Sequence, residues 1–299
     1  MRFLLSRHLS QFIAIYDLGS LRAASSTLGL TQPALSKSLH QFENLLDVVL
    51  FDRTGGKLTP TPFADILRMR ANIILKEAEF TAREIEVIKD NFYKPMAASA
   101  GPVWLAEILP LVLPALYQAY PKFQMGIKLE GAGTSLSKIQ SGDLDMYFGF
   151  IPESVEQKGL AVISLLNLRM TVYARRHHPI HQKSPGRQLE MAGEYPWAGF
   201  GLGDGIENTV VKRASRFKGF TYGIESLLGL AKLAQQTDHI VISVDAVAET
   251  FADHDIVEVK GVDLDKYLMS GVVCRASLLN FSPVKFLIEE IRKRYSSHQ

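Results

Sequence analysis

The first fifty residues carry apolar positions at helical spacing, which predicts three short helices. The apolar face of the first helix consists of Leu9, Phe12, Ile13 and Tyr16. A second helix is expected over about 21–28, before the turn at Gly29. Thr31 can then cap a third helix, and Pro33 lies in its first turn, where a missing N–H is tolerated. The pattern therefore predicts a small helical bundle.

The third helix has one apolar side and one polar side. The apolar side consists of Leu35, Leu39, Phe42 and Leu46. Pro33, Lys37 and His40 point the opposite way at about 100° per residue. A short helix, a tight turn and a helix with a polar outer face form the helix-turn-helix arrangement, whose second helix enters the major groove of DNA. An ordinary three-helix bundle with a solvated third helix is the alternative interpretation.

The case for DNA as the partner rests on residue types and not on bulk charge. Gln32 can pair with adenine and Ser36 with several base edges, whereas Lys37 and His40 suit phosphates or guanine. The chain has 33 basic and 31 acidic side chains, a net charge of +2. Residues 1–60 hold six Lys/Arg and four Asp/Glu, again +2, which is a weak electrostatic signal for nucleic-acid binding.

A hairpin is expected after the third helix. Gly55-Gly56 separates two short segments that favour strands, and this spacing would place Arg53 and Lys57 on a wing beside the third helix. Both cations could meet phosphates. The predicted DNA-binding residues are Ser20, Arg22, Thr31, Gln32, Pro33, Ser36, Lys37, His40, Arg53 and Lys57.

Three strings in this region resemble the LysR-type transcriptional regulators. They are Thr31-Gln32-Pro33-Ala34-Leu35-Ser36, Leu50-Phe51-Asp52-Arg53-Thr54 and Leu58-Thr59-Pro60-Thr61. The resemblance extends along the chain and implies an all-α winged helix-turn-helix DNA-binding domain at 1–60, a linker and dimerisation helix at 61–91 and an α/β, two-lobed, periplasmic-binding-protein-like effector domain at 92–299. It implies a regulator of transcription that binds specific DNA sequences and is modulated by a small-molecule effector in the cleft of the last domain.

The expected linker helix has an apolar heptad pattern. From Phe63 to about Asn91 there is no Gly or Pro, and Thr61-Pro62 is a helix start signal. The heptad positions are Leu67, Ala71, Ile74, Ala78, Thr81, Ile85 and Ile88, widened by Ile66, Ile73, Phe80 and Val87. We expect a homodimer through this helix, assembled into a homotetramer. The alternative is a long helix that packs on its own domain.

Beyond residue 95 the pattern alternates between strands and helices, which predicts an α/β fold with largely parallel sheets. Separate strands are expected over 160–164 and 170–174, among others. The resemblance implies lobe I at about 92–164 and 270–299 and lobe II at about 165–269. The cleft between them is the expected effector site, because open α/β sheets bind ligands beyond the carboxyl ends of their strands.

Loops at these strand ends supply the candidate effector contacts. The loop 130–135 follows a strand and opens a helix, so its N–H groups can hold an anion. By resemblance, Thr134 falls on the position of a ligand-contacting hydroxyl. Phe150 stands where some relatives have Arg, which favours a less charged or partly aromatic effector. The predicted effector-binding residues are Ser99, Gly101, Trp104, Gly133, Thr134, Phe150, Phe200 and Gly201. Glycines that only serve turns are the alternative for each loop.

Other classes of function find little support in the sequence. The chain has 299 residues, no apolar run of 18 residues and no signal-peptide pattern, so we expect a cytoplasmic protein without a membrane partner. Nucleotide-binding and serine-nucleophile motifs are absent, so we expect neither an enzyme nor a cofactor. Pro179 interrupts the histidines at 177, 178 and 181, which argues against a metal site. The competing hypothesis is a small-molecule-binding module of periplasmic-binding-protein type without a DNA-binding role.

Overall fold

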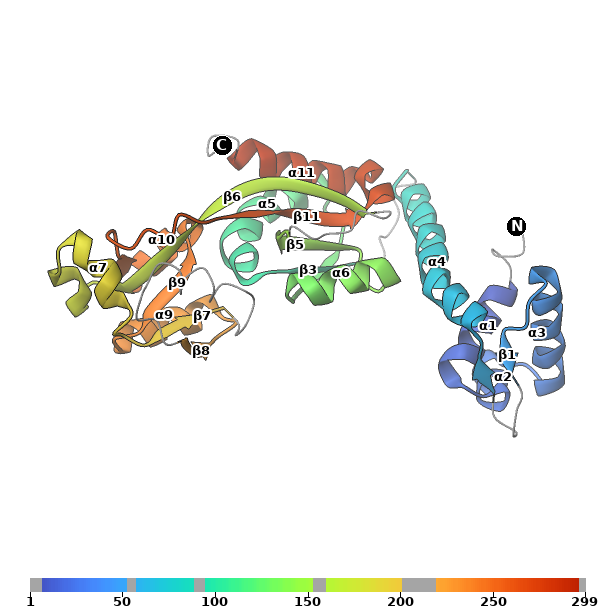
Figure 1. The fold of residues 1–299 in the computed structure, drawn as a ribbon. Helices are drawn as coiled ribbons and strands as arrows, with labels where there is room; N and C mark the ends of the chain where they lie inside the picture. The colour runs from blue at the N-terminus through green and yellow to red at the C-terminus, as the bar shows by residue number, and fades with distance from the viewer. Residues whose placement is uncertain (1–6, 53–57, 89–94, 153–159, 201–218, 296–299) are drawn as a thin grey trace. The chain divides into compact units, whose positions relative to one another are not determined.

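The computed structural model describes residues 7–52, 58–88, 95–152, 160–200 and 219–295 (Figure 1). The chain divides into two compact units, one over residues 1–93 and one over most of residues 94–299. The first unit is helical with a two-stranded hairpin, and the second is a mixed α/β structure. No helix in the described ranges combines the length and apolarity that crossing a bilayer requires.

The first unit is a three-helix core with a hairpin and a long helix. Its elements are α1 (Arg7–Leu18), α2 (Leu21–Leu28), α3 (Gln32–Leu46), β1 (Phe51–Asp52), β2 (Thr59–Pro60) and α4 (Pro62–Ile88). The start of α2 is capped by Ser20, whose side chain accepts a hydrogen bond from the N–H of Ala23, and Gly29 ends it in the left-handed conformation. Thr31 caps α3 in the same way through the N–H of Ala34. The predicted bounds of α2 and the predicted cap of α3 are therefore confirmed.

Part of the predicted heptad pattern of α4 is used within the chain. Leu67, Ala71 and Ile74 pack against the core formed by α1, α2, α3 and the hairpin. Because α4 begins directly after β2, its first turns cover this core. Ala71 is fully buried there, so the prediction that it faces a second copy is wrong, whereas Leu67 and Ile74 are only partly buried. Ile66 and Ile85 lie on other parts of α4 and are exposed.

The second unit contains the strands of two lobes. Its strands are β3 (Met96–Ala100), β4 (Met125–Leu129), β5 (Met146–Phe150), β6 (Leu160–Arg175), β7 (Trp197–Gly199), β8 (Phe220–Gly223), β9 (Ile240–Val244), β10 (Ile256–Glu258) and β11 (Tyr267–Arg275). They pair in the order β4-β3-β5-β11-β6-β9-β7-β8, and β10 also pairs with β6. The long strands β6 and β11 run side by side and connect the two lobes (Figure 1).

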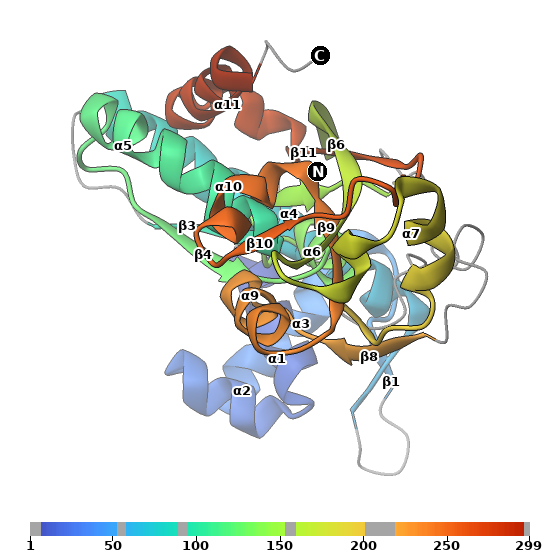
Figure 2. The ribbon, with the colours of Figure 1, turned by 90° about the vertical axis from the view of Figure 1, so that its left-hand side faces the viewer.

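Helices cover both sides of these strands. They are α5 (Leu109–Ala119), α6 (Ala132–Ser141), α7 (Pro185–Ala192), α9 (Leu227–Gln236), α10 (Ala248–Ala252) and α11 (Ser282–Tyr295), with a π-helical segment η3 (Trp104–Ile108) before α5. In lobe II, Ile240 and Ile242 of β9 belong to a core that includes α7, whereas Val241 packs with α9 and α10. Alternate residues of β9 thus face opposite helical layers. Figure 2 shows α7 on one side of β9 and α9 and α10 on the other.

Two predictions about the sheets are wrong. Residues 160–175 form the single strand β6, because the polar Asn167 in its middle is exposed and does not interrupt the pairing with Met269. The sheets are also not largely parallel. Parallel pairs join β3 with β4 and β5, and β7 with β8 and β9, but β6 and β11 are antiparallel to each other and to their other neighbours. The cause is the two long connections between the lobes, which run in opposite directions.

Candidate nucleic-acid interface and effector site

The outward side of α3 presents polar side chains at its N-terminal end. Gln32 and Lys37 are exposed and Ser36 is half-buried. Thr31 and Pro33 are exposed as well, in the first turn, although the hydroxyl of Thr31 is used as the helix cap. The opposite side of the helix is fully buried through Leu35, Leu39 and Phe42. The structure therefore brings these predicted residues together on one accessible surface.

The residues predicted on α2 lie beside its first turn. The oxygen of Ser20 accepts a bond from the N–H of Ala23 at 3.3 Å, so it serves the helix first. Arg22 is exposed and can extend toward a phosphate. Arg53 and Lys57 lie outside the described residues, between β1 and β2, whose register pairs Phe51 with Pro60.

A buried polar contact ties α3 to α1, which sequence reasoning missed. The hydroxyl of Ser38, on the inner side of α3, donates to Oε1 of Gln11 and lies 2.8 Å from Nδ1 of His8. The ring of His8 stacks on Phe42, with 5.9 Å between the ring centroids. A buried serine with two partners fixes the rotation of α3 about its own axis, and with it the direction of the polar face.

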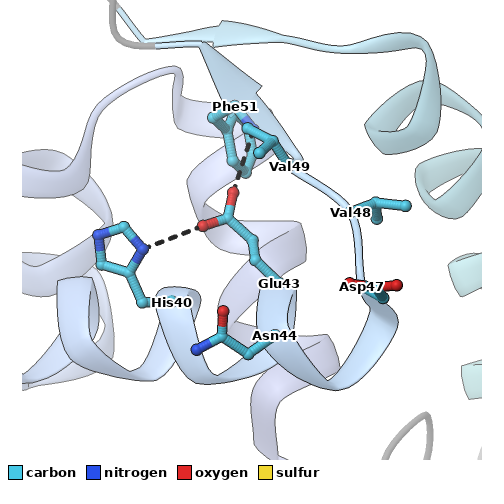
Figure 3. A pocket seen from close by; sticks show the side chains of 7 residues that line it. All are labelled: His40, Glu43, Asn44, Asp47, Val48, Val49 and Phe51. Carbon is cyan, nitrogen blue, oxygen red and sulfur yellow. Dashed lines mark hydrogen bonds and ion pairs between the residues drawn. The ribbon is translucent and has the colours of Figure 1, made fainter.

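A second missed residue, Glu43, ties α3 to the hairpin. Its Oε1 accepts hydrogen bonds from the backbone N–H groups of Leu50 and Phe51, at 2.8 Å and 3.3 Å. Its Oε2 lies 3.3 Å from Nδ1 of His40. His40, Glu43 and Phe51 line a surface pocket of about 490 Å³ between the C-terminal half of α3 and the start of β1 (Figure 3). The signal available in the sequence was a carboxylate on the otherwise apolar side of an amphipathic helix.

In the second unit, two predicted effector loops are joined by serine hydroxyls. Ser99, near the end of β3, donates to Oγ of Ser135 at 2.8 Å, and both residues are fully buried. Ser135 in turn donates to the carbonyl of Gly131 at 2.9 Å. Gly133 and Thr134, at the start of α6, are exposed next to this network. The hydroxyl of Ser99 therefore holds the loop, while Thr134 lies at the surface.

The aromatic candidates differ in their exposure. Trp104 is 1% exposed, its Nε1 donates to Oγ of Ser270 at 2.7 Å, and it packs on Phe148. Such a residue supports the site from within. Phe150 lies at the carboxyl end of β5 and is 43% exposed. Phe200 is half-buried against the core around β9, α9 and α10.

Two glycines complete the placement of the predicted effector residues. Gly101 is half-buried at the end of β3, and its N–H donates to the carbonyl of Phe148 at 2.9 Å. A Cβ at Gly101 would lie 3.9 Å from the hydroxyl of Tyr147, which is an ordinary contact distance. Gly201 lies outside the described residues.

Glu107 is a half-buried acid that the sequence analysis did not single out. It lies on η3, close enough to Thr250 and Glu249 of α10 for both to influence its pKa. Its Oε1 is buried and has no hydrogen-bond partner in the described residues. Burial raises the pKa of this carboxyl, and the nearby charge of Glu249 raises it further.

Metal and thiol chemistry find no support in the described residues. No group of three or more metal-ligating side chains occurs there. His178 is buried, with Nδ1 accepting from the N–H of Ile180 and Nε2 donating to the carbonyl of Asp238, and burial lowers its pKa. Cys274 is buried in β11, and burial raises the pKa of its thiol to about 12.

Comparison with solved structures gives matches along nearly the whole chain. LysG from Corynebacterium glutamicum with bound effector Arg has a TM-score of 0.69 at 16% identity, covering 96% of this chain and 97% of that one. CbnR complexed with its target DNA has a TM-score of 0.61 at 16% identity, covering 96% and 98%. At this level of identity, the likeness shows the fold.

Two family models and a curated relative match the sequence. The relative is the HTH-type transcriptional regulator GbpR of Rhizobium radiobacter, 25% identical over 199 residues, or 64% of this chain and 63% of the relative. The chain thus spans less than two thirds of that relative. Residues 6–65 match the bacterial regulatory helix-turn-helix protein model of the lysR family, and residues 98–296 match the LysR substrate binding domain. Because these two models together cover most of the sequence, the chain belongs to the LysR family.

Proposed function

We propose that this chain is a sequence-specific DNA-binding transcription regulator whose DNA binding or activation responds to a small molecule. Residues 1–60 bind DNA, residues 61–91 link two chains, and residues 92–299 bind the effector. The observation that carries this proposal is the polar, exposed N-terminal side of α3 above a fully buried opposite side. Acting on chromosomal DNA, the protein works in the cytoplasm and regulates without catalysing a reaction.

The proposed roles on DNA follow from side-chain chemistry. Gln32 and Ser36 read base edges, because amide and hydroxyl groups can both donate and accept hydrogen bonds in the major groove. Arg22 and Lys37 contact phosphates and fix the register of the protein on the duplex. Arg53 and Lys57 lie outside the described residues and enter the proposal as further phosphate contacts.

Pairing of chains is supported by apolar surface on α4. Four of its side chains are about half exposed, namely Phe63 at 55%, Ile66 at 59%, Met69 at 54% and Ile85 at 47%. Large apolar side chains that are this exposed favour burial against another surface. We assign that surface to the α4 of a second copy. The resulting homodimer presents two α3 helices to two half-sites, and two such dimers form a tetramer.

The effector site is proposed at the cleft between the lobes. Thr134 and Gly133 are exposed at the N-terminal end of α6, and Phe150 is exposed at the end of β5. Gly101 and Phe200 lie at other strand ends and complete the wall of the proposed site. Gly201, the next residue after Phe200, lies outside the described residues and enters the proposal as a further contact. Ser99 and Trp104 position these loops from beneath. An effector that prefers one arrangement of the lobes shifts the population toward that arrangement.

Selection of bound genomic fragments followed by sequencing tests the DNA-binding role and separates it from a ligand-binding module that ignores DNA. We expect one enriched, two-fold symmetric sequence for the full chain. Gln32→Ala should relax the base preference at one position in each half-site by about 1–3 kcal/mol. The matched control is Ser10→Ala, which removes an exposed polar group from α1 and should leave the selected sequence unchanged. Enrichment of no sequence by the full chain would refute the proposal.

A further inference from the structure

The contact between His40 and Glu43 has a consequence for how DNA is read, and it rests on the proposed function. The side chain of His40 is 58% exposed on the outward side of α3, whereas that of Glu43 is 10% exposed. Nδ1 of His40 lies 3.3 Å from Oε2 of Glu43, so this edge of the ring faces the protein (Figure 3). Nε2 is the ring nitrogen left to meet a partner.

The position of the Glu43 carboxylate does not depend on His40. Its other oxygen, Oε1, accepts from the N–H groups of Leu50 and Phe51, which hold the carboxylate at the start of β1. A carboxylate only accepts hydrogen bonds. An Nδ1 without a hydrogen would turn its lone pair toward Oε2 of Glu43 at 3.3 Å, so the contact favours the hydrogen on Nδ1 of His40.

In a neutral imidazole, only one nitrogen carries a hydrogen, so the group that one nitrogen faces decides the state of the other. We infer that Glu43 fixes His40 in the Nδ1–H tautomer, so that neutral His40 offers Nε2 to DNA as a hydrogen-bond acceptor. Glu43 is then a positioning residue, and His40 is a determinant of base specificity.

This assignment changes the partner expected from residue type alone. Phosphate oxygens and the O6 and N7 atoms of guanine are acceptors, so a neutral Nε2 without a hydrogen cannot bond to them. The amino groups of adenine N6 and cytosine N4 are the donors that the major groove displays. Neutral His40 should therefore select adenine or cytosine, and the expectation that it suits phosphates or guanine does not apply to this tautomer.

The tautomer itself can be measured without DNA. Histidine side chains of the full chain are labelled with ¹⁵N, and the His40 signals are identified by their loss in His40→Asn at a pH where the ring is neutral. We expect a protonated Nδ1 and an unprotonated Nε2. Glu43→Gln keeps an acceptor for Leu50 and Phe51, but its amide can also donate to Nδ1, so the Nε2–H form should become the major one. A wild-type His40 with Nε2–H, or a ratio that Glu43→Gln leaves unchanged, would overturn the inference.

The base preference is tested by sequence selection with three variants. The position read by His40 is the one whose preference is lost in His40→Ala. The wild type should favour adenine or cytosine there by roughly fivefold, and Glu43→Gln should lose this preference or turn it toward guanine. Glu43→Gln combined with His40→Ala should match His40→Ala alone.

Three results would contradict the base preference: guanine as the wild-type choice, no position that responds to His40→Ala, or an effect of Glu43→Gln that persists without His40. If the wild type selects no sequence at all, the proposed function fails together with the base preference. The NMR signature still decides the tautomer in that case, so the two failures can be told apart.

Discussion

The two candidate sites differ in how their polar residues relate to the fold. At the DNA-binding surface, Gln32 and Lys37 extend outward from a helix whose other side is packed, and both side chains are exposed. At the effector site, Ser99 and Trp104 are buried and engaged with Ser135 and Ser270. A polar side chain on an exposed helical face thus points to a partner, whereas a polar side chain at a strand end often serves the fold first. The predictions below test this contrast.

The largest effect is expected at the buried ion pair of the effector unit. Nη2 of Arg275 donates to Oδ1 of Asp145 at 3.2 Å, and both residues are buried. Arg275→Met leaves a buried carboxylate without its cation, which should lower the free energy of unfolding by about 3–5 kcal/mol in chemical denaturation. The matched control is Arg176→Ala, which breaks an exposed pair with Asp255 and should cost less than about 1 kcal/mol.

A double variant sharpens this test. Asp145→Asn retains an oxygen for the N–H of Ala97, which the native Oδ2 accepts at 2.9 Å. Combined with Arg275→Met, it removes the charge that the single variant leaves buried, so the double variant should be more stable than Arg275→Met alone. Equal or lower stability of the double variant would show that the ion pair is not what Arg275 contributes.

A smaller effect on stability is expected at Trp104. Its size decides whether this residue serves the fold or the effector site. Trp104→Phe removes the indole N–H that meets Ser270 and leaves a small void, so the free energy of unfolding should fall by about 1–3 kcal/mol. Ser270→Ala removes the other partner, and the double variant should cost less than the sum of the two single changes. Full additivity would mean that the hydrogen bond contributes nothing.

The local features of the first unit could be predicted from the sequence because they depend on neighbouring residues. Thr31 caps α3 through the N–H of Ala34, three residues later, and Gly29 supplies a positive φ of 64° one residue after α2. Helical spacing likewise placed Leu35 and Leu39 inside. Short-range rules of this kind need no knowledge of the tertiary structure.

What could not be predicted depends on partners far along the chain. Ser38 is 27 residues from Gln11, and Trp104 is 166 residues from Ser270, so neither contact has a sequence signature. The antiparallel course of β6 and β11 is fixed by pairing between residues that lie roughly a hundred positions apart, from Tyr267 with Arg169 to Arg275 with Leu160. Alternation of strands and helices indicates an α/β fold but does not determine the direction of strands that pass from one lobe to the other.

The same contrast predicts that the contribution of Glu107 to stability depends on pH. Its pKa is raised in the folded chain, mainly by burial, so the folded carboxyl binds its proton more tightly than the unfolded one. The stability that this tighter proton binding contributes is fully present below the pKa that Glu107 has in the unfolded chain. It is lost as the pH rises through the raised pKa of the folded chain. Glu107→Gln should therefore be more stable than the wild type at pH 8 by about 1 kcal/mol, but not at pH 4.

Thermal unfolding at both pH values measures this effect. The control is Glu190→Gln on α7. Glu190 is exposed, so this change should leave the pH dependence of stability as it is in the wild type. If Glu107→Gln and the wild type differ in stability by the same amount at pH 4 and at pH 8, then titration of this carboxyl does not contribute to stability.

The smallest effect on stability is expected at Thr134, because this side chain lies at the surface of the site. Thr134→Val should change the free energy of unfolding by less than about 1 kcal/mol. If Thr134 contacts the effector, the loss of one hydrogen bond should shift the midpoint of the effector response by roughly fivefold in a reporter assay, with DNA binding retained. Ser184→Ala, which removes an exposed hydroxyl from lobe II, should shift neither quantity. A stable Thr134→Val protein with an unchanged response would place the effector elsewhere, and a strongly destabilised one would mean that even the exposed hydroxyls of this unit serve its fold.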